Sequence, residues 1–304
     1  MKFATHLRTA ATVTALVHSL VYADPQAASG EFPLAVLKAV TEDQSVQQKA
    51  RYGARHPVET LEFFEVKPGM TVIEVLPGGG WYTRILAPYL GDDGTLIGAH
   101  HADEVWQYLR PVRDLEWEAE RTERVRTWVE RTAADFAANA GVTLLAYQLS
   151  KMPEELVETV DRVLLFRMMH NLQEVGDGYV EAAINEAYRA LKPGGYAGVV
   201  QHRAPESSND DWANGEAGYL KPSSLIAKFE AAGFELVGQS EINANPKDRP
   251  TESDVVWRLP PTLRTSKEGT PEREAMLAIG ESDRMTLKFR KPKVGVSAFI
   301  DEAR

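Results

Sequence analysis

Residues 71–80 have the sequence TVIEVLPGGG, and this stretch decides the fold. Its first five residues are mostly β-branched and apolar, which predicts a short strand buried on both faces of a parallel sheet. A proline and three consecutive glycines follow, and they predict a tight turn that opens a helix over about 81–90. Glycines in such a turn let the backbone approach a ligand, and free N–H groups at a helix N-terminus can bind it. The stretch therefore predicts a strand, a ligand-binding loop and a helix in succession.

Strands and helices alternate along the chain after this unit. Short apolar runs predict strands, and amphipathic segments predict the helices between them. The strands are expected at 95–99, 142–147, 162–166, 196–201, 234–242 and 285–291, and the helices at 102–139, 177–191 and 222–232. This alternation predicts a doubly wound α/β fold, with a mostly parallel sheet of the seven-stranded type and helices on both faces. We expect the last strand to be an antiparallel edge.

The N-terminus has the pattern of an export signal. Lys2 and Arg8 accompany a modest apolar stretch, and Val21 and Ala23 are suitable residues for cleavage before Asp24. We therefore expect residues 1–23 to be a signal peptide and the mature protein to be exported to the periplasm. No other segment has eighteen consecutive apolar residues, so no membrane insertion is expected after cleavage. The alternative is an ordinary amphipathic N-terminal helix.

The mature chain, 24–304, is expected to be a single domain. Apolar residues at helical spacing predict an N-terminal helical addition within 24–66, with one helix over 34–52 and another from Pro57. The stretch 243–280 is rich in Asn, Pro, Lys, Asp and Thr, which predicts a loop that wraps the domain.

Composition excludes several classes of function. The net charge is −10 and no long basic run is present, so a nucleic acid is not the expected partner. The chain has no cysteine, which excludes disulfides, thiolate nucleophiles and cysteine metal sites. A small-molecule substrate is the expected partner.

Histidines gather where the predicted strands end. His100 and His101 follow the second strand, His170 follows the fourth and His202 follows the fifth. Ligands of doubly wound sheets bind at the carboxyl ends of the strands, and imidazoles there suit proton transfer or metal binding. A structural role for each histidine is the alternative.

Other polar clusters occupy the same predicted edge. Arg167 and Asn171 flank the histidine after the fourth strand, and they are suited to binding a carboxylate and to hydrogen bonding. Gln201-His202-Arg203 follows the fifth strand, with a structural role as the alternative. The cluster Gly280-Glu281-Ser282-Asp283-Arg284 is expected to be a salt-bridged turn, or else a wall over the site.

Two motifs carry a resemblance to a known family. Residues 72–80 resemble motif I of class I S-adenosylmethionine-dependent methyltransferases, and residues 191–195 resemble the turn before their fifth strand. The resemblance covers roughly residues 55–240. It implies a Rossmann-like methyltransferase fold, S-adenosylmethionine as cofactor and methyl transfer to a small molecule. More narrowly, segments at 77–83, 166–171, 243–248 and 281–285 resemble an exported bacterial branch of predicted methyltransferases.

The resemblance also implies which residues bind the cofactor. Near its methionine part it places the acid of the first strand, the glycines of the loop and two residues at the helix start: Glu74, Gly78, Gly79, Gly80, Tyr82 and Thr83. His100 aligns with the family's acid that binds the ribose hydroxyls. Leu76 stands where the motif has glycine, and we expect leucine not to share the φ freedom of a glycine.

For catalysis, we predict that Arg167 and Asn171 position the methyl acceptor and that His170 or His202 is the general base. Two alternatives stay open. One is a metal-dependent hydrolase or lyase whose ligands are histidines of the sheet edge together with an acid. The other is a non-catalytic periplasmic ligand-binding protein on the same scaffold.

Overall fold

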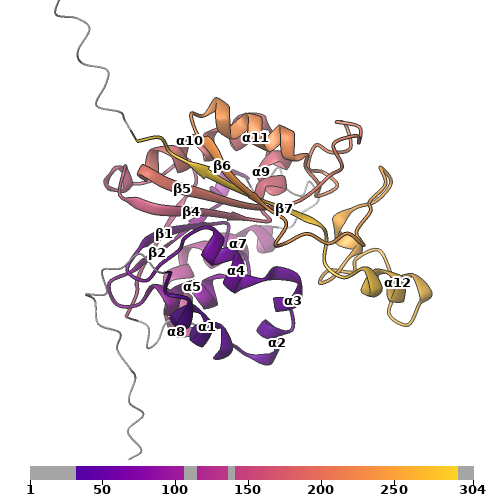
Figure 1. The fold of residues 1–304 in the computed structure, drawn as a ribbon, viewed down its shortest axis with the longest axis horizontal. Helices are drawn as coiled ribbons and strands as arrows, with labels where there is room; N and C mark the ends of the chain where they lie inside the picture. Colours follow the sequence, from indigo (N-terminus) through magenta and orange to yellow (C-terminus); the bar gives the residue numbers. More distant parts are fainter. Residues whose placement is uncertain (1–31, 106–114, 136–140, 294–304) are drawn as a thin grey trace, which may run out of the picture. The chain divides into compact units, whose positions relative to one another are not determined.

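The computed structural model describes residues 32–105, 115–135 and 141–293, which belong to one compact unit that begins at Phe32. Seven strands of this unit form one sheet in the order β3-β2-β1-β4-β5-β7-β6 (Figure 1). The predicted signal peptide, 1–23, lies outside the described residues. The predicted doubly wound α/β fold is confirmed.

The central strands are the ones that the sequence indicates most clearly. β1 pairs in parallel with β2 on one side and with β4 on the other. β3 pairs with β2, and β5 pairs with β4, again in parallel. The bounds are β1 Thr71–Val75, β2 Thr95–His100, β3 Thr143–Gln148, β4 Val160–Phe166, β5 Leu191–His202, β6 Glu235–Ser240 and β7 Arg284–Arg290.

The late strand β7 is antiparallel, as expected, but it is not the edge. It lies between β5 and β6 and pairs antiparallel with both. Burial explains the position, because Met285, Leu287 and Phe289 of β7 are buried. Residues of β6 are instead alternately exposed and half-buried, as an edge strand permits. The predicted position of β7 at the edge is therefore wrong.

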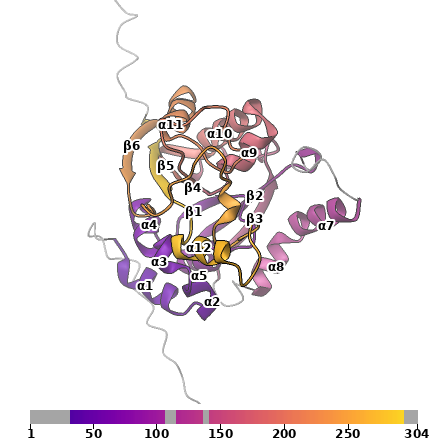
Figure 2. The ribbon, with the colours of Figure 1, turned by 90° about the vertical axis from the view of Figure 1, so that its right-hand side faces the viewer.

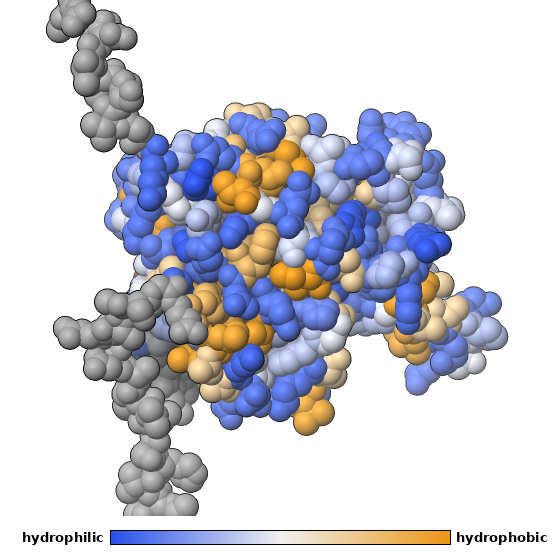
Figure 3. All heavy atoms as spheres, viewed as in Figure 1, coloured by the Kyte–Doolittle hydropathy of each residue, from blue (hydrophilic) through white to orange (hydrophobic). Residues whose placement is uncertain are grey.

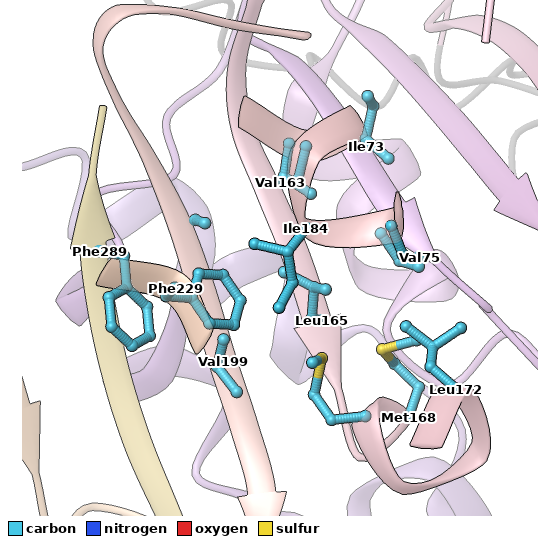
Figure 4. Close-up of a cluster of buried hydrophobic side chains, with 14 of the residues drawn as sticks. Ile73, Val75, Val163, Leu165, Met168, Leu172, Ile184, Val199, Phe229 and Phe289 are labelled. Carbon is cyan, nitrogen blue, oxygen red and sulfur yellow. The ribbon is translucent and has the colours of Figure 1, made fainter. Parts of the chain in front are cut away.

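Helices cover both faces of the sheet (Figure 1). On one face, α9, α10 and α11 bury apolar side chains against β1, β4, β5 and β7, and Figure 4 shows Ile184 and Phe229 among these contacts. On the other face, α1, α4, α5 and α8 form a second apolar cluster around Val72, Leu164 and Phe166. The helices of the sheet faces are α5 Thr83–Leu90, α7 Leu115–Arg126, α8 Trp128–Asp135, α9 Met169–Val175, α10 Asp177–Ala190 and α11 Pro222–Ala231, with the 3-10 turns η1 Asp103–Val105 and η2 Glu154–Leu156.

The N-terminal addition is more broken than the sequence suggests. The helix expected over 34–52 is three short helices, and the next helix begins at Pro57 as predicted: α1 Leu34–Glu42, α2 Val46–Lys49, α3 Tyr52–Arg55 and α4 Pro57–Phe63. Between α3 and α4 the backbone of His56 is left-handed, with φ 40°, which ends one helix and redirects the chain.

The segment expected to be a wrapping loop contains helix. The 3-10 turn η3, Val256–Arg258, and the helix α12, Pro271–Ile279, lie within it. In Figure 2 α12 lies in front of the strands, on the side toward the viewer. A small apolar cluster of its own supports this part of the chain, around Tyr219 and Val256.

The face of the molecule in Figure 3 carries little contiguous apolar surface. On the face in Figure 3, hydrophobic residues form small patches separated by hydrophilic ones. Among the described helices, none combines the length and the apolar character needed to span a bilayer.

Candidate functional site

Two cavities adjoin at the carboxyl ends of the central strands. Leu76, Gly78, Gly79 and Asn171 line both of them. The first, of about 310 Å³, is also lined by His100, His101, Arg124, Val125, Trp128 and Arg131, and we name it the histidine cavity. The second, of about 380 Å³, is also lined by Arg51, Arg55, Glu74, Val75, Pro77, Trp81, Tyr82, Arg84, Phe166, Arg167 and Met168, and we name it the arginine cavity. The glycine loop therefore lines two cavities of ligand size, at the place where the sequence predicts a ligand-binding loop.

The backbone of this loop is open to the cavities. A Cβ atom built on Gly79 would meet nothing within 4 Å, and one on Gly78 only the Leu76 carbonyl oxygen at 3.8 Å. Gly78 has φ 57° and Gly80 has φ 72°, so both need the left-handed freedom of glycine. The N–H of Gly80 donates to the carbonyl of Pro77 at 2.9 Å and closes the turn. Gly80 therefore shapes the loop without lining either cavity.

Leu76 has a left-handed backbone at the end of β1. Its φ is 49°, which a glycine adopts freely but a leucine adopts only at a steric cost. Its N–H donates to the carbonyl of Ala99 at 2.7 Å, which ties the end of β1 to β2. This contact holds the loop in place despite the steric cost of a Cβ atom in that conformation.

Glu74 is a buried acid that faces the arginine cavity from β1. Its carboxylate accepts a hydrogen bond of 2.6 Å from the hydroxyl of Thr83, the first residue of α5. Burial raises its pKa to about 8, and the hydrogen bonds from Thr83 offset only part of that rise. A cationic group of a ligand placed beside Glu74 would favour its ionised form. Thr83 itself lies behind Glu74 and does not line the cavity.

Arginines dominate the second cavity. Arg51, Arg55 and Arg167 line it, and the first two reach Glu281 with Nε–Oε distances of 2.7 and 3.2 Å. Arg284 contacts the same carboxylate at 3.2 Å. The expected salt-bridged turn before β7 is thus confirmed, and its acid also binds the N-terminal helices.

Trp81 and Tyr82 hold Arg55 against the cavity. The guanidinium of Arg55 stacks over the Trp81 ring at 4.5 Å, which is a cation–π contact. The hydroxyl of Tyr82 donates to the Arg55 carbonyl at 3.2 Å. From α2, the amide of Gln48 donates to the carbonyl of Trp81. The N-terminal helices therefore position the arginines over the glycine loop.

The two imidazole rings that line the histidine cavity are uncharged. Burial lowers the pKa of both His100 and His101 to about 4, so both rings are uncharged at neutral pH. His100 packs edge to face against Trp128, with ring centroids 5.5 Å apart. Its Nε2 is buried without a hydrogen-bond partner. This atom is therefore an unsatisfied polar group at the wall of the cavity.

His170 and His202 are placed together but away from the residues that line the two cavities. Their rings lie 5.3 Å apart, His170 contacts Gln201, and His202 Nδ1 lies 2.6 Å from the hydroxyl of Ser282. Burial lowers the pKa of His170 to about 4 and that of His202 well below its ordinary value. The structure thus divides the four strand-end histidines into two pairs.

Asn171 is the predicted catalytic residue that lines both cavities, and Arg167 lines one of them. Asn171 belongs to α9, a helix that begins at Met169 directly after β4 and that the sequence did not predict. The first turn of α9 places Asn171 toward the glycine loop and His170 toward β5.

The metal alternative has no ligand set in the described part of the chain. No group of three or more His, Asp or Glu side chains there could hold a metal ion. His100 faces one cavity, whereas His170 and His202 contact Gln201 and Ser282. The residues proposed as ligands are therefore not assembled around one point.

Comparison with solved structures agrees with this architecture. The [4+2]-cyclase SpnF has a TM-score of 0.52 and 16% sequence identity, over 86% of this chain and 94% of its own. An S-adenosylmethionine-dependent methyltransferase from Aquifex aeolicus gives 0.44 and 18%, over 68% and 93%. The 1,6-didemethyltoxoflavin-N1-methyltransferase of Burkholderia thailandensis, solved with S-adenosylhomocysteine, gives 0.45 and 12%, over 85% and 88%. The chain has the Rossmann-like methyltransferase fold. No family model and no curated protein sequence matches it.

The sequence did not indicate three of the residues that line the arginine cavity. Arg51, Arg55 and Trp81 were not predicted as site residues. Arg51 and Arg55 are four residues apart, which places them on one side of a helical turn and could have served as a signal. Their partner Glu281 is 230 residues from Arg51, so the sequence alone could not show what this pair contacts.

Proposed function

We propose that the protein transfers a methyl group from S-adenosylmethionine to a small-molecule acceptor. One observation supports this above the others. Two cavities of ligand size adjoin at the carboxyl end of the central strand and share the open backbone of Gly78 and Gly79. A cofactor and an acceptor must meet in this way for direct group transfer.

The lining residues suit the cofactor. Glu74 offers a buried carboxylate for an ammonium group, and the loop N–H groups at the start of α5 suit polar atoms. His100 lines the other cavity and would take a ribose hydroxyl in place of the family's acid. When bound, S-adenosylmethionine supplies an activated methyl group on its sulfonium sulfur.

The remaining residues would orient the acceptor and exclude water. Asn171 lies between the two cavities and can hydrogen-bond ligands in either of them. Arg167 lines the arginine cavity, which it shares with Glu74. His170 and His202 remain our proposed general bases for an acceptor that must lose a proton. Both rings are neutral at neutral pH, as a base requires, and His170 is next to Asn171 in the chain.

Isothermal titration of the mature protein with S-adenosylhomocysteine tests the cofactor. We expect binding by the wild type and none by Gly79→Leu, since a side chain at Gly79 enters open space without a clash in the fold. Gly178→Leu is the matched control, because a Cβ atom there also meets nothing within 4 Å but lies on α10. Absence of heat from the wild type at millimolar ligand would end the cofactor proposal.

Binding alone does not establish the reaction, because one fold hosts many activities and one similar structure is a cyclase. Methyl transfer is tested by release of S-adenosylhomocysteine in the presence of candidate acceptors. A protein that binds the cofactor but never turns over would instead support the non-catalytic ligand-binding alternative.

We also propose that the protein belongs to the exported bacterial branch and acts in the periplasm. The support is the N-terminal pattern around Lys2, Arg8 and Ala23. Mass spectrometry of protein recovered from the periplasmic fraction should find an N-terminus at Asp24. Recovery of the full-length chain from the cytoplasmic fraction only would refute this.

A further inference from the structure

The arginine cavity has an excess of positive charge at its wall. Arg51, Arg55 and Arg167 line it, and the single carboxylate of Glu281 pairs with Arg51, Arg55 and Arg284. Burial and the neighbouring arginines lower the pKa of Arg167 well below its ordinary value. Uncompensated buried cations of this kind are costly, so their retention indicates that something else neutralises them.

The same wall presents hydrogen-bond donors without acceptors. Nη1 and Nη2 of Arg55, Nη2 of Arg51 and Nε1 of Trp81 are buried and have no partner. All three side chains line the arginine cavity. Buried polar atoms are nearly always paired in folded proteins, so a group of four unpaired donors indicates a missing partner. Because all four are donors, the partner must supply acceptors.

Protein contacts fix these donors in place. Glu281 binds Nε of both Arg51 and Arg55, and the Trp81 ring lies under the Arg55 guanidinium. Held in this way, Arg55 keeps its two Nη groups for a second acceptor, as in a forked contact with an oxyanion. The side chain of Arg55 is only 1% exposed, so leaving its two Nη groups without an acceptor is costly.

The charge exceeds what the cofactor can neutralise. S-adenosylmethionine has one carboxylate, one ammonium group and a cationic sulfonium sulfur, and Glu74 matches only the ammonium group. The bound cofactor would therefore add no net negative charge beside these arginines.

We infer that the arginine cavity binds the methyl acceptor through an oxyanion, a carboxylate or phosphate group, held by Arg51, Arg55 and Trp81. The term acceptor rests on the proposed methyl transfer, whereas the oxyanion site stands on the unpaired donors alone. The acceptor is therefore an acidic small molecule, and neutral acceptors are disfavoured.

Calorimetric titration with two probes, inorganic phosphate and malonate, tests this inference in the presence and absence of saturating S-adenosylhomocysteine. We expect at least one probe to bind the S-adenosylhomocysteine complex, and the tighter probe identifies the class of oxyanion. Arg51→Gln should weaken binding by about tenfold, because a charge-assisted hydrogen bond is lost. Trp81→Phe keeps the ring under Arg55, loses only Nε1 and should weaken binding by a few fold. Arg189→Gln, at a surface pair with Glu154, is the control and should bind as the wild type does.

Each other outcome has a defined meaning. If neither probe binds, or if Arg51→Gln binds as tightly as the wild type, the oxyanion site is refuted. If S-adenosylhomocysteine displaces the probe, the arginines serve the cofactor's carboxylate, and the assignment to the acceptor is overturned. If S-adenosylhomocysteine gives no heat while a probe binds and Arg51→Gln weakens it, the proposed methyl transfer fails but the oxyanion site stands.

Discussion

Leu76 and Arg167 occupy equivalent places at the ends of β1 and β4, and both have left-handed backbone, with φ 49° and 57°. The N–H of each donates to the next strand, to the carbonyl of Ala99 at 2.7 Å and of Val200 at 2.6 Å. Both side chains line the arginine cavity. Backbone strain in non-glycine residues is uncommon and persists where the surrounding contacts enforce it. Its occurrence at two strand ends beside one cavity supports a functional site there.

Replacement of Leu76 can separate this strain from side-chain packing. Leu76→Ala and Leu76→Gly remove nearly the same contacts, but only glycine adopts a φ of 49° without steric cost. We expect Leu76→Gly to be more stable than Leu76→Ala by about 1 kcal/mol. Urea unfolding measures the difference. An alanine variant as stable as the glycine variant would show that the backbone at this residue is not strained.

Glu74 should make stability depend on pH. Its pKa is about 8 in the folded protein against 4.5 for an ordinary glutamate, because it is buried. Between these values the folded state binds more protons than the unfolded state, so the contribution of Glu74 to stability falls as pH rises from about 4.5 to about 8.

Glu74→Gln mimics the protonated form and can still accept the hydrogen bond of Thr83. We therefore expect this variant to gain stability relative to the wild type as pH rises through that window, measured by urea unfolding at a series of pH values. A constant difference between the two proteins would contradict the raised pKa.

At the scale of elements, apolar runs predicted the strands to within a few residues, whereas several short helices were not predicted. α9 has only seven residues and includes His170 and Asn171, so it lacks a long periodic pattern. α12 did carry a signal that was overlooked. Thr270 caps it, Pro271 is its first residue and Gly280 follows its end, which is the usual order of helix start and stop residues.

The sequence predicted only those parts of the candidate site that lie at strand ends. Glu74, Gly78, Gly79, His100 and Asn171 lie at or soon after the ends of strands, and the structure brings all of them to the two cavities. Arg51 and Arg55 precede β1 and so lie outside the alternating strands and helices of the sheet. Their place depends on packing between segments far apart in the chain, which periodicity does not encode.

Glu281 joins these distant elements, since it binds Arg55 of α3 and Arg284 of β7. Glu281→Gln leaves buried arginines without their carboxylate, and we expect it to lower the free energy of unfolding by about 3 kcal/mol. Glu154→Gln removes an exposed pair with Arg189 and should cost about 1 kcal/mol or less. Chemical unfolding of both variants compares them. Equal losses would show that the buried cluster does not hold α3 to β7.

Over the whole molecule, the sign of the charge at the site is opposite to that of the chain. The protein has a net charge of −10, yet Arg51, Arg55 and Arg167 line the arginine cavity, and the first two share the carboxylate of Glu281 with Arg284. Net charge bears on solubility and on bulk partners, whereas binding depends on the local field. The acidic composition therefore argues against nucleic acid but not against an anionic small molecule.

Acid should destabilise the whole protein through its buried histidines. Burial lowers the pKa of His100, His101 and His170 to about 4, against 6.5 for an ordinary histidine, and it lowers the pKa of His202 as well. The unfolded state then binds more protons as pH falls from about 6.5 to about 4, so the free energy of unfolding decreases over that range. His202→Asn removes one of these groups, and urea unfolding should show a smaller decrease than in the wild type.

The control for this comparison is Ser282→Ala, which disturbs the same buried contact without removing a group that titrates. It should lower stability by a similar amount at every pH in the range. If the stability of His202→Asn falls as steeply with acid as that of the wild type, then His202 takes up a proton within the folded protein. That result would show that burial does not lower the pKa of His202.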